Sequence, residues 1–468
     1  MSIRPPSVVA VALMLAAALL AGSHASAAPA TWTPVAGQVR GAVMDAAADG
    51  PRVLVVSVDR RQVIVTTIRD RRVVRRQVVL DSFRRGTVDR ARVLALPRGR
   101  ALVVWSGVGL GSSLRPSGAA RFGPATDVVR HPGVTSAVAR GGVVTATPGG
   151  DVVAAWWGGP AGGRLGIWSS SLGAGGTWGA PREISAGTYP LPTSPLPPIV
   201  AVGAAASPDG GVAVAWRQPL PGASPAEPRG ATIAGVTRSP SGAWGAPVAL
   251  GQGDVTSFDL TVAAPAAGTV AAAWAESRAE RPDGVTSTTC LVAAVATGSG
   301  PVARDDLTCR GQYSPGLVRL LRAGDGGLLA AWQAIPDYGA GDPLRAAIEL
   351  FRRPPGAGAW APAGLAVADT LGFWRLEAFA PLPAGGALVL SDLSQTVRGT
   401  NGRQVRAVAV ADDGTVVRRV SGPTAPRPAA ADKRLHALGS GAYRGVMAET
   451  LGGFPYRTRL TLLRLPQT

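Results

Sequence analysis

The sequence is poor in charged residues, and it has no long apolar run after its first 27 residues. Charged side chains make up 16% of the 468 residues, and hydrophobic ones make up 46%. This balance excludes an intrinsically disordered chain, which combines low hydrophobicity with high net charge. No later stretch reaches the ~18 consecutive apolar residues of a membrane-spanning helix, so we expect no membrane span. The length suits two or three domains, or one large repetitive domain.

Cysteine and histidine are also scarce, which limits metal binding. The chain has two cysteines and three histidines, and only His131 and His436 lie beyond the N-terminal segment. The sequence contains no H-E-x-x-H, C-x-x-C or G-x-S-x-G motif, and Lys433 has no Gly-rich loop before it. We therefore predict no metal site and no cofactor.

The first 27 residues have the pattern of an export signal. Arg4 supplies a basic start, residues 8–21 form an uncharged apolar stretch, and Ala25-Ser26-Ala27 has the small-x-small spacing that signal peptidase accepts. We predict a signal peptide over residues 1–27, cleavage after Ala27, and a secreted protein whose residues 28–468 form one domain.

Lysine is nearly absent, and arginine carries the positive charge. The formal net charge is +18, and Lys433 is the only lysine. One interpretation is attraction to polyanions such as wall polymers, acidic glycans or nucleic acid. The other is a GC-rich genome, whose codons favour Arg, Ala, Gly and Pro together. The segment 52–100 concentrates the charge, with 14 Arg against four Asp.

A short apolar strand ending in tryptophan recurs along the chain. The clear copies end at Trp105, Trp156, Trp216, Trp274 and Trp332, so they lie 51, 60, 58 and 58 residues apart. Degenerate copies are predicted to end at Ser57, Ser391 and Glu449. A turn rich in Gly, Pro and Asp precedes several of these strands, and a third strand and a Trp-containing fourth segment follow. Such self-similarity is the signature of a repeat architecture.

Four antiparallel strands in each repeat describe a β-propeller. We predict an all-β fold, a single β-propeller of eight four-stranded blades, with seven blades as the alternative. The eighth copy ends after its third strand. The segment 31–35 has the Trp-x-Pro spacing of a fourth segment, so we expect the N-terminal strand to close the last blade and remove an open sheet edge.

Cys290 and Cys309 flank the predicted hairpin of the fifth copy. The middle of the interval between them falls inside the turn 297–300, which places the two cysteines opposite each other. In an exported protein this spacing predicts a structural disulfide, contributing ~3 kcal/mol at most.

One segment carries a family resemblance. Residues 171–178, SLGAGGTW, resemble the Asp box of bacterial sialidase-like propellers, S-x-D-x-G-x-T-W. The matching residues are Ser171, Gly175, Thr177 and Trp178. Gly173 replaces the aspartate, and SPSGAW (239–244) and PGAGAW (355–360) look like further degenerate versions. The resemblance implies a sialidase-like propeller, in which this box is a structural turn away from the catalytic centre.

The catalytic residues of that family are not recognisable here. A sialidase-like site would combine an arginine cluster, a Tyr–Glu pair and an aspartate acid/base. The chain has no Arg-Ile-Pro start motif, and its five tyrosines show no pairing with Glu by blade position. We therefore assign no catalytic residue and favour a function without catalysis.

Variable loops on one face of the predicted propeller provide the candidate ligand-binding residues. In a propeller, the loops from the second to the third strand and from each blade to the next lie on one face, where recognition is usually placed. The candidates are Tyr189, Glu276, Arg278, Asp337, Tyr338, Asp392, Arg403 and Tyr456.

Three functions remain open. The first is a secreted, monomeric, non-catalytic propeller that binds a glycan or protein ligand through the loop-rich face, with no specific nucleic acid partner. The second is a divergent glycoside hydrolase using loop carboxylates such as Glu276 and Asp337, which must then lie ~5–10 Å apart. The third is a basic adhesin for an anionic cell-wall polymer. Its predicted contacts are Arg71, Arg72, Arg75 and Arg76.

Overall fold

The computed structural model describes residues 30–465, with gaps at 60–61, 82–87, 108–109, 130–136, 161–165, 174, 186–200, 220–230, 254–258, 280–286, 312, 315, 337–346, 357, 368–371, 397–403, 423–432, 439–441 and 452–456. The predicted signal peptide lies outside the described residues. Within them the protein is all-β, and its one helical element is the short 3-10 turn Pro97–Gly99. No helix in these ranges is long and apolar enough to cross a membrane.

Most of the strands form sheets that follow one another along the chain, each built from consecutive antiparallel strands. One comprises β6 (Val88–Leu96), β7 (Arg100–Gly107), β8 (Leu110–Arg115) and β9 (Thr126–Asp127). The next comprises β10 (Ala137–Ala146), β11 (Val152–Pro160), β12 (Gly166–Leu172) and β13 (Arg182–Glu183). It is followed by β14 (Val202–Ala206), β15 (Val212–Pro219), β16 (Ala231–Arg238) and β17 (Val248–Gly253). Then come β18 (Leu260–Ala263), β19 (Thr269–Ala279), β20 (Ser287–Thr297) and β21 (Ala303–Gly311).

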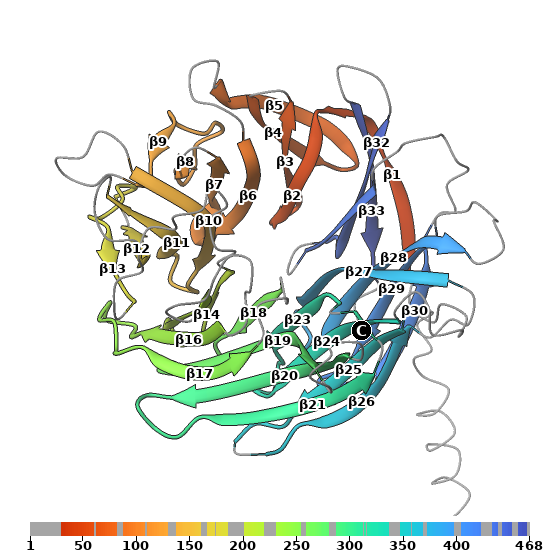
Figure 1. The fold of residues 1–468 in the computed structure, drawn as a ribbon. Helices are drawn as coiled ribbons and strands as arrows, with labels where there is room; N and C mark the ends of the chain where they lie inside the picture. Colours follow the sequence, from red (N-terminus) through yellow and green to blue (C-terminus); the bar gives the residue numbers. More distant parts are fainter. Residues whose placement is uncertain are drawn as a thin grey trace, which may run out of the picture.

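The series continues with a five-stranded sheet, in which β22 (Tyr313–Ser314) and β23 (Val318–Arg322) both pair with β24 (Leu328–Pro336). Its outer strands are β25 (Ala347–Arg353) and β26 (Ala361–Val367). The last sheet of this series comprises β27 (Gly372–Pro381), β28 (Ala387–Thr396), β29 (Val405–Val410) and β30 (Val416–Ser421). Figure 1 shows the sheets arranged around a common centre, which is consistent with a β-propeller.

Both ends of the described chain lie in one eight-stranded sheet. Its first half contains β2 (Ala42–Asp49), β3 (Arg52–Asp59), β4 (Gln62–Arg69) and β5 (Arg72–Asp81). Its second half contains β31 (Lys433–Ala437), β32 (Gly445–Leu451), β33 (Arg457–Arg464) and the N-terminal strand β1 (Thr31–Arg40). A single parallel bridge between Ala36 and Arg72 joins the halves.

The N-terminal strand pairs with the end of the chain, as its Trp-x-Pro spacing predicts. β1 runs antiparallel to β33, with Trp32 opposite Leu463 and Thr31 opposite Arg464. Its buried residues Val35 and Val39 share a hydrophobic cluster with strands of both halves of the sheet. This pairing covers the edge that β33 would otherwise expose.

The recurrent tryptophans pack between neighbouring sheets. Trp216, Trp274 and Trp332 are at most 1% exposed, and each lies on the second strand of its sheet. Trp274 shares a hydrophobic cluster with Ala213 and Ala215, which lie on the tryptophan strand of the preceding sheet. The small alanines leave room for the indole ring. This packing explains why the repeated strands are rich in alanine as well as tryptophan.

Two of the Asp-box-like segments form the same turn. In the first, the amide of Gly173 donates to the carbonyl of Thr177, and the amide of Gly179 donates to that of Ser171. In the second, Ser239 donates to Ala243 and Gly245 donates to Thr237 in the same pattern. The turn therefore tolerates loss of the aspartate, because its backbone supplies these hydrogen bonds.

Candidate functional site

Three of the eight predicted ligand-binding residues are described by the structure. They are Glu276, Arg278 and Asp392. The other five fall outside the described residues, and they are Tyr189, Asp337, Tyr338, Arg403 and Tyr456. Glu276 and Arg278 lie together on β19, whereas Asp392 lies on β28 of another sheet, 5% exposed and opposite Arg375 and Val405.

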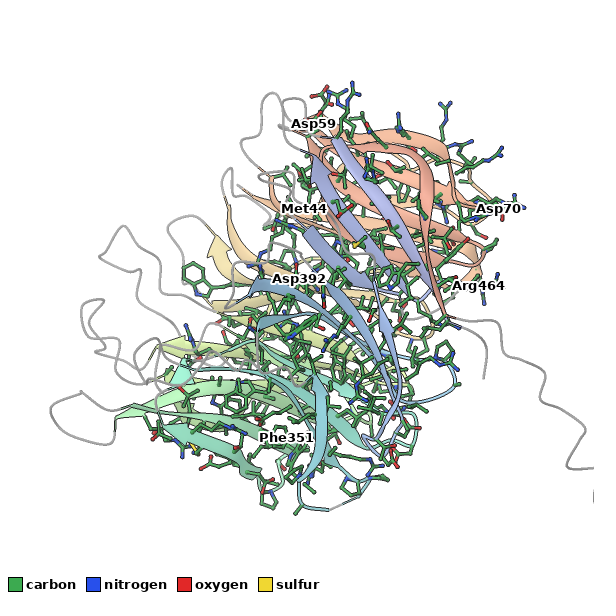
Figure 2. All side chains as sticks on the ribbon, turned by 90° about the vertical axis from the view of Figure 1, so that its right-hand side faces the viewer. Met44, Asp59, Asp70, Phe351, Asp392 and Arg464 are labelled. Carbon is green, nitrogen blue, oxygen red and sulfur yellow. A yellow bond between two sulfur atoms is a disulfide. The ribbon has the colours of Figure 1, made fainter. Side chains whose placement is uncertain are left out.

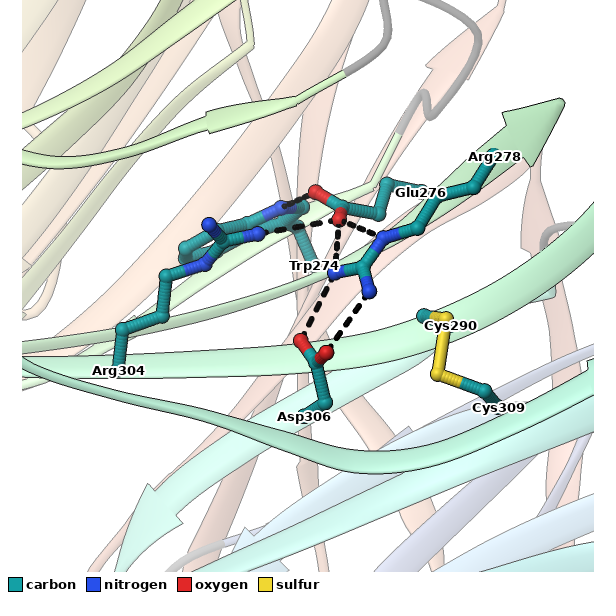
Figure 3. A network of polar contacts seen from close by, with 7 residues as sticks. All are labelled: Trp274, Glu276, Arg278, Cys290, Arg304, Asp306 and Cys309. Atoms are coloured by element: carbon teal, nitrogen blue, oxygen red, sulfur yellow. Dashed lines mark hydrogen bonds and ion pairs between the residues drawn. A yellow bond between two sulfur atoms is a disulfide. The ribbon is translucent and has the colours of Figure 1, made fainter. Parts of the chain in front are cut away.

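Glu276 is the centre of a buried polar network (Figure 3). Glu276 is 2% exposed. Its carboxylate accepts hydrogen bonds from Trp274 Nε1 at 3.0 Å, Arg278 Nε at 2.7 Å and Arg304 Nη2 at 3.1 Å. Both carboxylate oxygens are therefore occupied. Asp306 receives two further bonds from Arg278, at 2.7 and 2.8 Å.

The network favours the charged forms of Asp306 and Arg278. The hydrogen bonds from Arg278 lower the pKa of Asp306, and those same bonds raise the pKa of Arg278 above its ordinary value. The Glu276 carboxylate accepts three hydrogen bonds from Trp274, Arg278 and Arg304, and a carboxylate can accept about four. This arrangement stabilises the sheet, and it does not resemble a general acid or base.

The disulfide lies beside this network. Cys290 on β20 lies directly opposite Cys309 on β21 and also opposite Glu276 on β19. The two cysteines form a disulfide with a Cα–Cα distance of 4.1 Å, so the predicted pairing across a hairpin is confirmed. The described residues contain no cluster of three or more potential metal ligands.

A groove along the N-terminal strand brings four arginines together. This arginine groove has a volume of about 950 Å³ and is lined by β1 and by side chains of β5 and β33. Its arginines are Arg40, Arg76, Arg457 and Arg459. None of the described residues that line it is acidic. Figure 2 views the molecule from the side on which β1 and β33 lie, with Arg464 labelled at the end of β33.

The strand register places these arginines side by side. Arg40 lies opposite Arg457, and Gln38 lies opposite Arg459. Arg40 forms an ion pair with the fully buried Asp59, which balances one charge. Arg76 donates to the backbone carbonyl of Gln38. Among the described residues neither Arg457 nor Arg459 has an ion-pair or hydrogen-bond partner, and Arg459 lies opposite Glu449 of β32.

An irregularity in β1 creates the groove. The register with β33 shifts between Pro34 and Gln38, where Pro34 lacks an N–H to donate and Gly37 adopts a left-handed φ of 96°. Within this stretch the amide of Ala36 instead donates to Arg71 of the first half-sheet, at 2.7 Å. The chain thereby approaches β5, which brings Arg76 next to the closing strand.

The outer strand of the first half-sheet extends this basic surface. The four arginines predicted as adhesin contacts are all exposed, and they are Arg71, Arg72, Arg75 and Arg76. Sequence reasoning named Arg76 but missed Arg40, Arg457 and Arg459. The sequence contained the information needed to find them. The predicted antiparallel pairing of the N-terminal strand with the last repeat places the start of β33 beside the end of β1.

A second titratable pair lies on the first strands of the two half-sheets. His436 Nδ1 of β31 is 3.8 Å from Asp45 Oδ1 of β2, and the other oxygen of Asp45 accepts the Val93 amide at 3.1 Å. Burial raises the pKa of Asp45 to about 6 and lowers that of His436 to about 4. The pair therefore lies where the two half-sheets meet the sheet that begins with β6, and sequence analysis did not identify it.

No protein-family model matches this sequence, and no curated protein sequence matches it. Among solved structures the chain resembles an ulvan lyase of a new polysaccharide lyase family, with a TM-score of 0.52 and 10% identity over 93% of this chain and 96% of that one. A structure of ulvan lyase bound to -[GlcA(1-4)Rha3S]- gives a TM-score of 0.48 and 11% identity, over 93% and 96% of the two chains. A Hadza microbial sialidase gives a TM-score of 0.35 and 13% identity, over 76% and 75%. The chain shares the fold of the ulvan lyase over nearly its whole length.

Proposed function

We propose that this protein is a secreted, eight-bladed β-propeller that binds an acidic polysaccharide in the arginine groove without cleaving it. The observation that carries the proposal is the groove itself, in which Arg40, Arg76, Arg457 and Arg459 meet and no carboxylate belongs to the described lining. Guanidinium groups suit carboxylate and sulfate groups because each can donate two parallel hydrogen bonds.

The contacts between sheets support eight blades. The first strands of the sheets contact one another in the order β2, β6, β10, β14, β18, β23, β27 and β31, and β31 contacts β2 again. Each first strand would then belong to one blade, and β1 would be the fourth strand of the last blade. We propose that this propeller comprises residues 28–468. The disulfide and the proposed signal peptide over residues 1–27 agree with export.

A polysaccharide suits both the fold and the shape of the groove. One solved structure that shares this fold is called a polysaccharide lyase. The groove follows an extended strand, and an extended polymer can contact several of its arginines at once. Its lining contains Arg, Gln, Pro, Val and Gly, and the guanidinium groups stay protonated at every physiological pH. This lining therefore supports binding and supplies no general acid.

The hydrolase alternative receives no support from Glu276. That carboxylate already accepts hydrogen bonds from Trp274, Arg278 and Arg304, and its proposed partner Asp337 lies outside the described residues. The adhesin alternative is contained in the proposal, because the exposed arginines of β5 adjoin the groove.

The test is polymer binding by mature protein and two charge-matched double variants. The probes are polygalacturonate, dextran sulfate and neutral dextran, each measured by calorimetry over a range of salt concentrations. Arg457→Gln/Arg459→Gln removes two groove charges. Arg182→Gln/Arg419→Gln removes two exposed charges elsewhere.

We expect the native protein to bind at least one acidic polymer and to ignore dextran. The groove variant should lose about tenfold or more in affinity, and its dependence of log K on log salt should be shallower by about two. The control variant should bind as the native protein does. Equal losses in both variants would show unspecific charge attraction, and retained binding in the groove variant would place the site elsewhere.

A further inference from the structure

Arg40 is held in the arginine groove by a buried carboxylate. Asp59 is the last residue of β3 (Figure 2), it is 0% exposed, and it does not belong to the lining of the groove. Its Oδ2 accepts a hydrogen bond from Arg40 Nε. The Arg40 side chain is 53% exposed, so its accessible part lies beyond this inner nitrogen. Asp59 can therefore act on a ligand in the groove only through Arg40.

The backbone of Arg40 is fixed as well. Ser57, which is also on β3 and 0% exposed, donates its hydroxyl to the Arg40 carbonyl at 2.6 Å. The hydroxyl of Thr458 on β33 donates to the Gly41 carbonyl at 2.7 Å. Gly41 has a left-handed φ of 87°, and a Cβ built on it would lie 2.5 Å from the Val58 carbonyl oxygen. The main chain therefore passes too close to β3 for a larger residue at this position.

Stability alone does not explain a carboxylate at position 59. Asp59 Oδ1 is buried and has no hydrogen-bond partner among the described residues, and a buried acceptor without a donor is unfavourable. Replacing a buried ion pair by apolar side chains often leaves stability unchanged or raises it. Arg40, in contrast, gains a fixed position, because its carbonyl and its Nε are both bound to β3. An arginine that is ordered before the ligand arrives loses less side-chain entropy on binding.

The bond to Nε also determines which donors remain. A guanidinium group has one N–H on Nε and two on each Nη nitrogen. Within the part of the chain that the structure describes, no residue binds Nη1 or Nη2 of Arg40, so this end can donate two parallel bonds to an acid group. Arg457 lies directly opposite Arg40 on the neighbouring strand, and the Cβ atoms of such a pair are about 4.5–5.5 Å apart. One acid group can therefore contact both arginines.

We propose that Asp59 is a positioning residue, which holds Arg40 so that Arg40 and Arg457 together bind one carboxylate or sulfate group of the polymer. Two guanidinium groups and one carboxylate leave a single positive charge, which one monoanionic group balances. This inference rests on the proposed function, and it assigns the acid group a place within the arginine groove.

Charge and position predict opposite effects for substitutions of Asp59. Each substitution removes a negative charge beside the groove, so charge alone predicts tighter binding of an acidic polymer. Loss of the contact with Nε predicts weaker binding, because the ligand must then order Arg40 itself. Asp59→Leu should therefore weaken polymer binding about tenfold, and Asp59→Asn, which keeps an acceptor oxygen, should weaken it about two- to threefold.

The experiment is calorimetry on the full mature protein with polygalacturonate and dextran sulfate as probes. Asp81→Asn is the matched control, because Asp81 is an exposed carboxylate of the same half-sheet that accepts from Gln62 and does not line the groove. It should bind at least as tightly as the native protein. Asp59→Leu in an Arg40→Gln background should cause no further loss, because Asp59 then has no guanidinium group to hold. Thermal unfolding shows whether each variant is folded.

Unchanged or tighter binding by both Asp59 variants, when the native protein binds, would overturn the inference and leave the proposed function standing. A further loss in the Arg40→Gln background would also overturn it, because Asp59 would then act by another route. Failure of the native protein to bind either polymer would overturn the proposed function and this inference with it. If Asp59→Leu does not fold, the direction of the Asp59→Asn effect decides the question.

Discussion

Arg40 on the first strand of the protein lies directly opposite Arg457 on its last strand. Like charges that face each other across two strands are destabilising, and the ion pair of Arg40 with Asp59 compensates only one of them. The pairing of β1 with β33 therefore leaves the charge of Arg457 without an ion-pair partner among the described residues.

Arg457→Gln should stabilise the protein in the absence of ligand. Removing one of two facing charges should raise the free energy of unfolding by ~0.2–1 kcal/mol at low salt, and the gain should shrink as salt screens the repulsion. Chemical denaturation at two salt concentrations measures this. Arg464→Gln is the control, because Arg464 lies on the same strand opposite Thr31. A destabilised Arg457→Gln variant would contradict the explanation.

Glu276→Gln should destabilise the protein and leave polymer binding intact. The change leaves Arg304 and Arg278 facing a neutral group, and because their side chains are 37% and 38% exposed, the loss of these charge-assisted hydrogen bonds costs ~1–3 kcal/mol. Asp306→Asn is the matched control, because the Asp306 side chain is 43% exposed and its loss should cost ~1 kcal/mol or less. Thermal unfolding and calorimetry give the two readouts. Loss of binding with native stability would instead assign Glu276 to a ligand site.

Loss of the disulfide should weaken the fold without abolishing it. Cys290 and Cys309 are 19 residues apart, and closing a loop of this size contributes ~3 kcal/mol at most. The Cys290→Ala/Cys309→Ala variant should therefore melt at a lower temperature, as should native protein treated with dithiothreitol. Adding dithiothreitol to the variant should change nothing. A shift in the reduced variant would show that the reductant acts elsewhere.

Acidification should change the free energy of unfolding in opposite directions through Asp45 and His436. The raised pKa of Asp45, about 6 in the folded state against 3.8, adds stability as pH falls through this window. The lowered pKa of His436, about 4 against 6.5, removes stability as pH falls from 6.5 to 4. The two effects largely cancel in the native protein.

Single variants should separate the two effects. Asp45→Asn should lose more stability than the native protein between pH 7 and pH 4.5, and His436→Gln should lose less. Melting temperatures at these two pH values provide the comparison. Identical pH profiles for the two variants would contradict the opposed assignment.

Much of the fold could be predicted because each sheet repeats the same local pattern. The tryptophan strands ending at Trp216, Trp274 and Trp332 all lie where their spacing places them, and each tryptophan packs on the preceding sheet. Cys290 and Cys309 were paired correctly because a hairpin places residues at equal distances from its turn opposite each other.

The candidate site was harder to predict because it depends on an irregularity. The register shift between Pro34 and Gln38 brings β1 against β5, and regular alternation does not contain this information. Glu276 was predicted as a loop ligand, yet it lies on a strand and its carboxylate is used by Trp274 and Arg304. An acceptor two residues after a tryptophan occurs again at Gln218, which accepts from Trp216. Trp156 and Trp332 have Gly158 and Ala334 at that position, so the repeat alone does not predict this role.

The pairing of β1 with β33 also determines how late in synthesis the eight-stranded sheet can form. The hydroxyl of Thr458 donates to the carbonyl of Gly41, across 417 residues of sequence. During synthesis β1 therefore has no partner until β33 has been made. A chain that stops early leaves Val35 and Val39 uncovered and an unpaired strand edge.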